Sequence, residues 1–224
     1  MIGSVRVVGT GRAGGAIAAR LAERGLAVHA GREPLADAEL VLLAVPDAAI
    51  AEVAQRVTVG PWIAHVSGAT PLAALAPHAR RFSVHPLQTL TRERGADQLD
   101  GAWAAVTAET DEAGAVANWL ATTLGLRPFP LADADKPLYH AGAAIASNFL
   151  VTLYRAAARL LDETDVPAEA LIPLMRRTID NGFVLTGPIA RGDWSTVEAH
   201  LRALEERAPD LVPLYRALAE ATRP

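Results

Sequence analysis

Short apolar runs alternate with longer periodic stretches over the first 132 residues of the chain. Runs of six to nine residues bounded by glycine, proline or polar residues predict strands, and apolar residues that recur every three to four positions predict helices. The predicted strands are residues 4–9, 26–32, 38–46, 62–68, 81–86, 102–108 and 126–131. The predicted helices between them are residues 13–25, 47–57, 71–79 and 112–124.

The strand signals stop after residue 132, and four helical patterns follow at residues 137–162, 167–181, 195–207 and 210–222. Ser195 and Glu198 have the spacing of a capping box at the start of the third helix. We therefore expect an α/β fold: a Rossmann-type, doubly wound, mainly parallel sheet over residues 1–132, followed by an all-helical domain over residues 133–224.

The stretch "VVGTGRAGG" carries three glycines, Gly9, Gly11 and Gly14, in GxGxxG spacing. This spacing alone is a weak signal, but here it follows a predicted strand and opens a predicted helix, as a dinucleotide-binding loop does. Such glycines allow a tight turn, close approach of a pyrophosphate, and close packing of helix on strand. A plain strand–helix turn is the alternative. The residues predicted to hold the pyrophosphate are Gly9, Thr10, Gly11, Arg12, Ala13 and Gly14.

The end of the second predicted strand indicates which nucleotide is bound. NAD-binding proteins usually carry Asp or Glu there, which bonds the ribose 2′-hydroxyl. This chain carries Arg32, whose guanidinium favours a 2′-phosphate, with Glu33 one position later. The sequence therefore predicts NADP(H) as the cofactor.

In open α/β sheets, ligands bind beyond the carboxyl ends of the strands. Val45 and Pro46 end the third predicted strand, Ser67 ends the fourth, and His85 ends the fifth. We expect Val45, Pro46 and Ser67 to border the cofactor, and Ser67 and His85 to border the substrate. A turn serine and a loop histidine bonded to backbone are the alternatives.

Lys136 is the only lysine among 21 lysine and arginine residues. It precedes Pro137, so it is expected at the start of the long helix, at the junction of the two domains. His140 follows four residues later, on the same helix face, and Asn148 lies further along. Lysine can donate a proton when its pKa falls on burial, which arginine practically cannot do. We predict Lys136, His140 and Asn148 as catalytic residues; a chance surface lysine is the alternative.

Composition excludes several classes of site. The chain has no cysteine, and its six histidines show no metal-binding spacing, so no metal site is expected. The net charge of −4 argues against a nucleic-acid partner. No signal peptide and no membrane span are apparent, so the expected location is cytoplasmic.

The motifs "VVGTGRAGG", "HVSGA", "HPLQTL", "KPLYHAGAAIASNF" and "LTGPIARGD" together resemble an uncharacterised family of Rossmann-like NADP oxidoreductases. That family is similar to the superfamily of 6-phosphogluconate dehydrogenase, ketopantoate reductase and pyrroline-5-carboxylate reductase. The resemblance covers nearly the whole chain. It implies reduction of a carbonyl or imine, a helical substrate-binding domain, and a homodimer formed through that domain.

In the ketopantoate reductase and hydroxyacid dehydrogenase relatives, a catalytic lysine is followed four residues later by asparagine. Lys136 matches that lysine, whereas position 140 is His140, and Asn148 falls near a further family asparagine. The resemblance therefore leaves the substrate open. A non-catalytic NADP(H)-binding sensor and a deazaflavin-linked NADP reductase are the alternative functions.

The motif "LTGPIARGD" predicts a structured loop between two helices. Thr186 or Arg191 is a candidate for the substrate pocket, in the same chain or in a partner subunit. Asp193 is a candidate cap of the following helix, with Arg191 as its pairing partner.

Overall fold

The computed structural model describes residues 2–35 and 37–223. Two compact units divide the chain between Ile145 and Ala146, later than the boundary predicted at residue 132. The first unit extends this far because helix α4 (Lys136–Ala144) begins on a buried residue, Lys136, which bonds to segments of the sheet domain.

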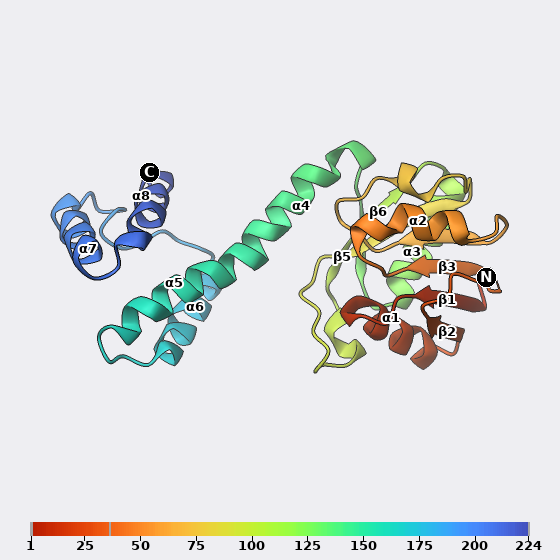
Figure 1. Cartoon of the computed structure of the whole chain (residues 1–224), viewed down its shortest axis with the longest axis horizontal. Helices are drawn as coiled ribbons and strands as arrows, with labels where there is room; N and C mark the ends of the chain where they lie inside the picture. Colours follow the sequence, from red (N-terminus) through yellow and green to blue (C-terminus); the bar gives the residue numbers. More distant parts are fainter. Residues whose placement is uncertain (1, 36, 224) are drawn as a thin grey trace. The chain divides into compact units, whose positions relative to one another are not determined.

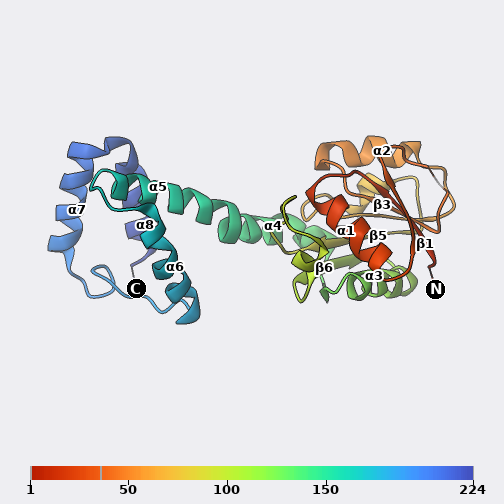
Figure 2. The same cartoon turned by 90° about the horizontal axis from the view of Figure 1, so that it is seen from below.

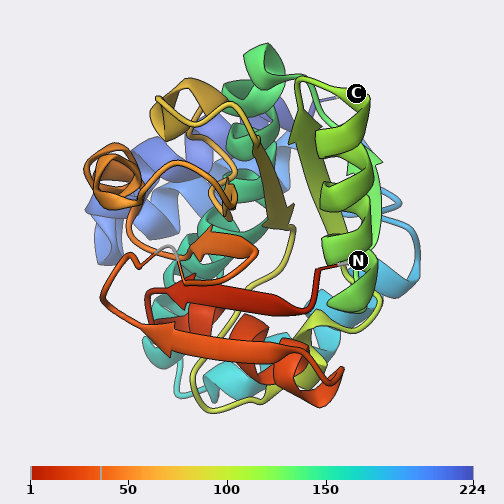
Figure 3. The ribbon, with the colours of Figure 1, turned by 90° about the vertical axis from the view of Figure 1, so that its right-hand side faces the viewer.

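The first unit is built on a seven-stranded sheet with the order β2-β1-β3-β4-β5-β6-β7 (Figure 1). Strands β1 to β5 pair in parallel, β6 is antiparallel to β5, and β7 is parallel to β6. Figure 3 shows β1 and β2 side by side and running in the same direction. The α/β fold predicted from the sequence is confirmed. The strands are β1 Ser4–Val8, β2 Ala27–Gly31, β3 Leu40–Leu43, β4 Trp62–His65, β5 Arg81–Pro86, β6 Trp103–Ala108 and β7 Arg127–Pro130.

Helices cover both faces of this sheet. Figure 2 shows α1 (Arg12–Glu23) and α3 (Asp111–Thr123) on one face and α2 (Ile50–Arg56) on the other. Each face has its own apolar core, and β3, which is buried along its whole length, contributes to both. The predicted helix 71–79 is only a short 3₁₀ turn, Leu72–Leu75. The other 3₁₀ turns of this unit are Asp47–Ala49, Ala96–Leu99 and Asp133–Asp135.

Helix α1 lies close to the end of β1, and two glycines make this possible. Gly9 has φ of +108°, a conformation that residues with a side chain rarely adopt. A Cβ atom on Gly14 would lie 2.0 Å from the Gly9 carbonyl oxygen and 3.1 Å from the Ala44 side chain. The loop and the first turn of α1 can therefore pack together only with glycine at these two positions.

The second unit is helical. Helix α4 runs into a π-helical turn, Ile145–Phe149, and then into α5 (Leu150–Asp162), so the predicted helix 137–162 is continuous but widened where the two units meet in sequence. A 3₁₀ turn (Ala168–Ala170) leads into α6 (Leu171–Asp180), and α7 (Trp194–Arg207) packs on α8 (Val212–Ala221) after a 3₁₀ turn at Pro209–Leu211. In the part of the chain that is described, no helix is long and apolar enough to cross a membrane.

The start of α7 corrects one prediction from the sequence. The N-cap is Asp193, whose carboxylate accepts a hydrogen bond from Thr196 N at 3.1 Å. This is the capping role that the sequence suggested for Asp193. The capping box of Ser195 and Glu198 is wrong, because Ser195 lies inside the helix and its hydroxyl donates to Asp193 Oδ1 at 2.9 Å. The carboxylate of Asp193, two residues before Ser195, accepts the hydrogen bond from the first turn that a capping serine would have accepted.

The two adjacent glycines of α1 offer a matched test of this packing. We expect Gly14→Ala to lower the free energy of unfolding by about 1–3 kcal/mol, because the new methyl group forces the helix away from the loop. Gly15→Ala should instead raise it by about 0.5–1 kcal/mol, because Gly15 is exposed, has open space at its Cβ position and lies in a helix. Urea unfolding of both variants measures the difference. Equal stability of the two would contradict the close approach.

Candidate functional site

The glycine loop ends at an open helix N-terminus. Gly9 N donates to Gly31 O at 2.7 Å, which ties the loop to the end of β2. Gly11 is the N-cap of α1, and no side chain caps the helix there. Apart from Gly11 and its two chain neighbours, no heavy atom lies within 4 Å of the position of a Gly11 Cβ. Thr10 and Arg12 are exposed beside it. The free N–H groups of the first turn therefore face open space, which is the arrangement that binds a phosphate. The loop thus fits the pyrophosphate of a dinucleotide.

Arg32 follows directly after the last residue of β2 and is exposed. Among the described residues it forms no ion pair, whereas Glu33 pairs with Arg56 of α2 at 3.6 Å. The acidic neighbour of Arg32 is thus partly neutralised by a second arginine. The Arg32 guanidinium is available to an anionic ligand at this end of the sheet.

Ser67, at the end of β4, organises the turn that follows it. Its hydroxyl donates to Asp47 Oδ2 at 2.7 Å and accepts from Thr70 N at 3.0 Å and Ala69 N at 3.2 Å. Asp47 follows Pro46, so this contact joins the ends of β3 and β4, where Val45 packs against the α2-side core. The structure brings the predicted residues Val45, Pro46 and Ser67 to one edge of the sheet.

His85 and His140 meet over the turn after β4. Their ring centroids lie 5.9 Å apart, and a Cβ atom on Gly68 would lie 2.8 Å from both His140 Nδ1 and His85 Cε1. Because Gly68 has no side chain, both imidazoles can approach the same backbone. Among the described residues, His140 Nδ1 is buried without a hydrogen-bond partner.

Tyr139 is a residue of this site that reasoning from the sequence missed. Its hydroxyl oxygen lies 2.7 Å from His85 Nδ1, and the two rings meet edge to face with centroids 5.5 Å apart. Phe129 of β7 packs against the Tyr139 ring at 6.0 Å, and Trp103 of β6 packs against Phe129 at 6.2 Å. Tyr139 follows Lys136 by three residues, so the two residues share one helix face. This spacing was the feature of the sequence that could have indicated Tyr139 as a site residue.

His85 and His65 are neutral at physiological pH. Burial lowers the pKa of His85 to about 4, and the charge of His140 lowers it further. Burial also lowers the pKa of His65, in the middle of the sheet, to about 3. Burial raises the pKa of Tyr139 to about 12, so the phenol keeps its proton. His85 and Tyr139 are therefore neutral hydrogen-bonding groups, and Asp47 is the carboxylate beside Ser67.

Lys136 is buried, with 2 % of its surface exposed. Its ammonium donates to Thr70 O at 2.8 Å and Ser83 Oγ at 3.0 Å, and it lies 3.2 Å from Asp133 Oδ1. Burial lowers the pKa of Lys136, and the bond to Asp133 opposes that shift. An ammonium has three hydrogens, and all three have acceptors here. These contacts of Lys136 thus join the start of α4 to the sheet domain.

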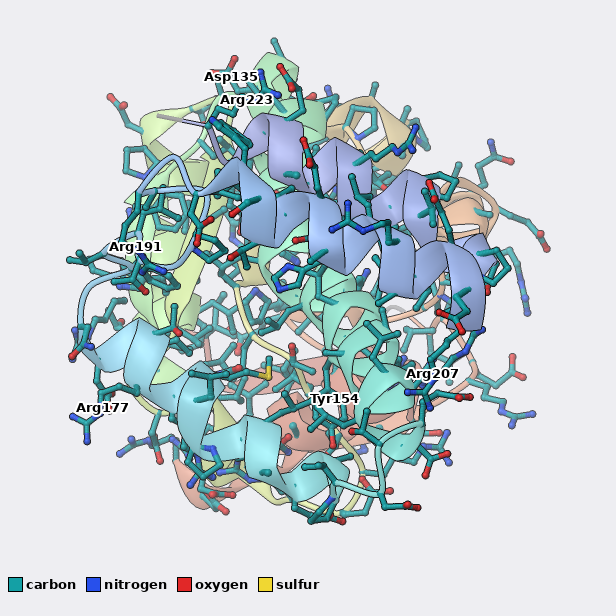
Figure 4. All side chains as sticks on the ribbon, turned by 90° about the vertical axis from the view of Figure 1, so that its left-hand side faces the viewer. Asp135, Tyr154, Arg177, Arg191, Arg207 and Arg223 are labelled. Atoms are coloured by element: carbon teal, nitrogen blue, oxygen red, sulfur yellow. The ribbon has the colours of Figure 1, made fainter. Side chains whose placement is uncertain are left out.

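The remaining predicted residues belong to the second unit. Asn148 lies in the π-helical turn and is exposed. Thr186 and Arg191 lie between α6 and α7 and are exposed; Figure 4 shows Arg191 reaching outward from the ribbon. Thr186 lines a cavity of about 450 Å³ together with Leu174, Arg177, Thr178, Asn181 and Val184. No group of three or more histidine, aspartate or glutamate side chains within the described ranges is placed to hold a metal ion.

Comparison of the sequence with known families gives two matches. Residues 30–89 match a Rossmann-like domain, and residues 102–222, more than half of the chain, match the domain of unknown function DUF2520. The chain belongs to the DUF2520 family. This agrees with the resemblance found from its motifs. No curated protein matches the sequence.

Several solved structures share the fold of this DUF2520 protein. A Bacteroides fragilis protein, named a "putative NADP oxidoreductase", is 21 % identical, with a TM-score of 0.83 over 99 % of this chain and 98 % of that one. A Thermotoga maritima protein is 25 % identical, with a TM-score of 0.78 over 97 % and 96 %. A reductive aminase from Aspergillus terreus, in complex with NADPH and ethyl levulinate, is 18 % identical, with a TM-score of 0.69 over 99 % and 93 %.

The bonding of Lys136 predicts a stability effect rather than a purely catalytic one. We expect Lys136→Met to lower the free energy of unfolding by about 1–3 kcal/mol, because it leaves buried acceptors on Thr70 and Ser83 without a donor. Lys136→Arg should also destabilise, because the guanidinium does not fit a site filled by an ammonium. The exposed Arg92→Met is the control, and urea unfolding is the measurement. A Lys136→Met variant as stable as the parent would show that the three bonds do not hold α4.

Proposed function

We propose that this protein is an NADP(H)-dependent oxidoreductase that transfers a hydride between nicotinamide and a small oxo or imino compound. The observation that carries the proposal is the glycine loop. A Cβ atom on Gly9 would lie 2.3 Å from Ala44 O and one on Gly14 would lie 2.0 Å from Gly9 O, whereas the Gly11 position opens into free space at the N-terminus of α1. The loop is closed toward the protein and open toward a ligand, as a pyrophosphate cradle requires.

The names of structural neighbours support the same class of cofactor. Besides the Aspergillus terreus aminase with NADPH, they include a Plasmodium falciparum pyrroline carboxylate reductase with NADP bound. Others bind NAD, such as a Cupriavidus necator protein. A nicotinamide cofactor is common to them, and Arg32 makes NADP(H) the form that we propose for this chain.

In this proposal each part of the carboxyl edge has its own task. The loop from Gly9 to Gly14, with Thr10, Arg12 and Ala13, would hold the pyrophosphate, and Arg32 the 2′-phosphate. Val45, Pro46 and Ser67 would border the nicotinamide, which supplies the hydride when bound. His85 and His140 would border the substrate. Lys136 would act by holding α4 in place, and Asn148, Thr186 and Arg191 are further candidates for substrate contact.

Nucleotide selectivity tests the role of Arg32. We expect Arg32→Gln to raise the Kd for NADPH by about ten- to a hundredfold, because this is the usual effect on affinity of losing a hydrogen bond to a charged group. The Kd for NADH should change less than about twofold. Arg24→Gln, an exposed arginine just after the end of α1, is the matched control. Isothermal titration calorimetry of NADPH and NADH with the parent and with each of the two variants gives the six dissociation constants.

The same protein samples test the reaction. Oxo and imino acids are screened for oxidation of NADPH by absorbance. Saturable NADPH binding with turnover supports the proposal, and saturable binding without turnover on any compound would favour a nucleotide sensor. Failure of the parent to bind NADPH, or binding of NADH as tight as that of NADPH, would overturn the choice of cofactor.

We also propose that the second unit pairs with a second copy of itself. Among residues 146–223, only Val197, Leu204 and Ala208 are buried hydrophobic residues. Such a small core does not compensate the entropy of ordering a helical unit of this size. Large apolar side chains are exposed instead at the end of the π-helical turn, on α5, on α6 and in the segment after α6: Phe149, Leu150, Val151, Leu153, Leu174, Ile179, Phe183, Val184 and Leu185. An apolar surface of this extent marks an interaction site.

Sedimentation velocity tests the pairing. We expect the parent to sediment as a dimer at about 10 µM, a concentration typical of such measurements, and the double variant Leu150→Gln/Leu153→Gln to shift toward monomer, because it removes apolar area from α5. Leu35→Gln/Val59→Gln, which changes two exposed aliphatic residues of the first unit, is the matched control. A monomeric parent, or a dimer unaffected by the α5 variant, would contradict the proposal.

A further inference from the structure

Tyr139 and His85 form a pair whose geometry is fixed from several sides. The phenol oxygen and His85 Nδ1 are 2.7 Å apart, although the two residues are 54 positions apart in sequence. Phe129 packs on the Tyr139 ring from β7, and His140 packs on His85 from the neighbouring position of α4. The start of α4 is held by the three bonds of Lys136. These contacts therefore hold the phenol of Tyr139 near the carboxyl end of β5.

Two hydrogen-bond arrangements fit the same 2.7 Å contact. In one, the phenol donates to Nδ1, and its hydrogen is occupied. In the other, the Nδ1–H of His85 donates to the phenol oxygen, so the phenolic hydrogen is free to point at a ligand. The contact with Tyr139 is the one hydrogen bond of the His85 ring within the described residues, so no bond at Nε2 forces the first arrangement.

We propose that Tyr139 is the proton donor of the reaction and that His85, in its Nδ1–H tautomer, positions the phenol and stabilises the phenolate that proton transfer leaves behind. This inference rests on the proposed function, because it assigns the proton that reduction of a carbonyl requires. It names a catalytic residue different from Lys136.

The proton balance of this step is complete within the site and solvent. When the carbonyl carbon of the substrate gains a hydride, its oxygen becomes an alkoxide. The O–H bond of Tyr139 breaks as the O–H bond of the product alcohol forms, and the negative charge moves to the phenol oxygen. The Nδ1–H of His85 donates to that charged oxygen, which strengthens their hydrogen bond. A proton from water then restores the phenol.

The other donors near this edge are less suited to the task. The three hydrogens of Lys136 already have acceptors inside the protein. His85 is neutral at physiological pH, because its pKa is about 4, so it carries no excess proton to give. The hydroxyl of Ser67 donates to Asp47. Tyr139 keeps its proton, since burial raises its pKa to about 12, and a phenol is a stronger acid than an alcohol.

The tautomer of His85 is measurable without turnover. The full-length protein labelled with ¹⁵N-histidine is observed by long-range ¹⁵N–¹H NMR at pH 7.5, with and without NADPH, and His85→Asn assigns the signal. We expect His85 to show a protonated Nδ1 and an unprotonated Nε2 in the parent. A protonated Nε2 with an unprotonated Nδ1 would overturn the proposal, because the phenolic hydrogen would then be bound to His85. This result stands whether or not a substrate is found.

The second arm measures the proton donor in the reaction, with NADPH and the carbonyl probes pyruvate, phenylglyoxal and 4-nitrobenzaldehyde. We expect Tyr139→Phe to lower kcat by about a hundredfold or more, because a general acid usually contributes at least this factor to the rate. The Kd for NADPH should stay within about twofold of the parent's. Tyr154→Phe, on α5, is the matched control. A Tyr139→Phe variant with kcat within about threefold of the parent would overturn the proposal while leaving the proposed function intact. Absence of NADPH binding in the parent would instead overturn the proposed function.

Discussion

The three bonds of the Lys136 ammonium hold together the part of the first unit that carries the candidate site. They join the start of α4 to the turn after β4 through Thr70 and to the middle of β5 through Ser83. Asp133, the third partner, also accepts a hydrogen bond from Leu72 N at 3.0 Å. One buried cation thus fixes three segments, and Tyr139 and His140 follow it within one helical turn. Their contacts with His85 depend on where this turn begins.

The same bonds explain why a chain so rich in arginine carries lysine at this position. A compact ammonium can direct three hydrogens at three acceptors that surround it, whereas a planar guanidinium directs five hydrogens in one plane. The acceptors here are a carbonyl oxygen, a hydroxyl and a carboxylate from three different segments. A buried charge is tolerated only when its partners compensate the lost hydration. The arrangement of these three acceptors is thus sufficient to explain a lysine at position 136, without any catalytic role.

Features that depend on local sequence were predictable, and those that depend on distant contacts were not. The strands, the glycine loop and the cap at Asp193 are each specified by neighbouring residues. Two of the three acceptors of Lys136 lie 66 and 53 residues away, so its position was predictable but these two bonds were not. Tyr139 was missed because a tyrosine in a helical pattern is typical of a core residue. Only the position of β5 shows that it meets His85.

The carboxyl edge of the sheet combines two kinds of environment that the proposed hydride transfer would require. The open N-terminus of α1 and Arg32 supply positive potential where phosphates would lie. His85, near the end of β5, and its partner Tyr139 are buried enough to remain neutral. Because parallel strands end at the same edge, β1, β2, β3, β4 and β5 place both environments on one side of the sheet. The separation of charged and neutral ends is therefore a consequence of the topology, and the side chains at each strand end determine which chemistry it serves.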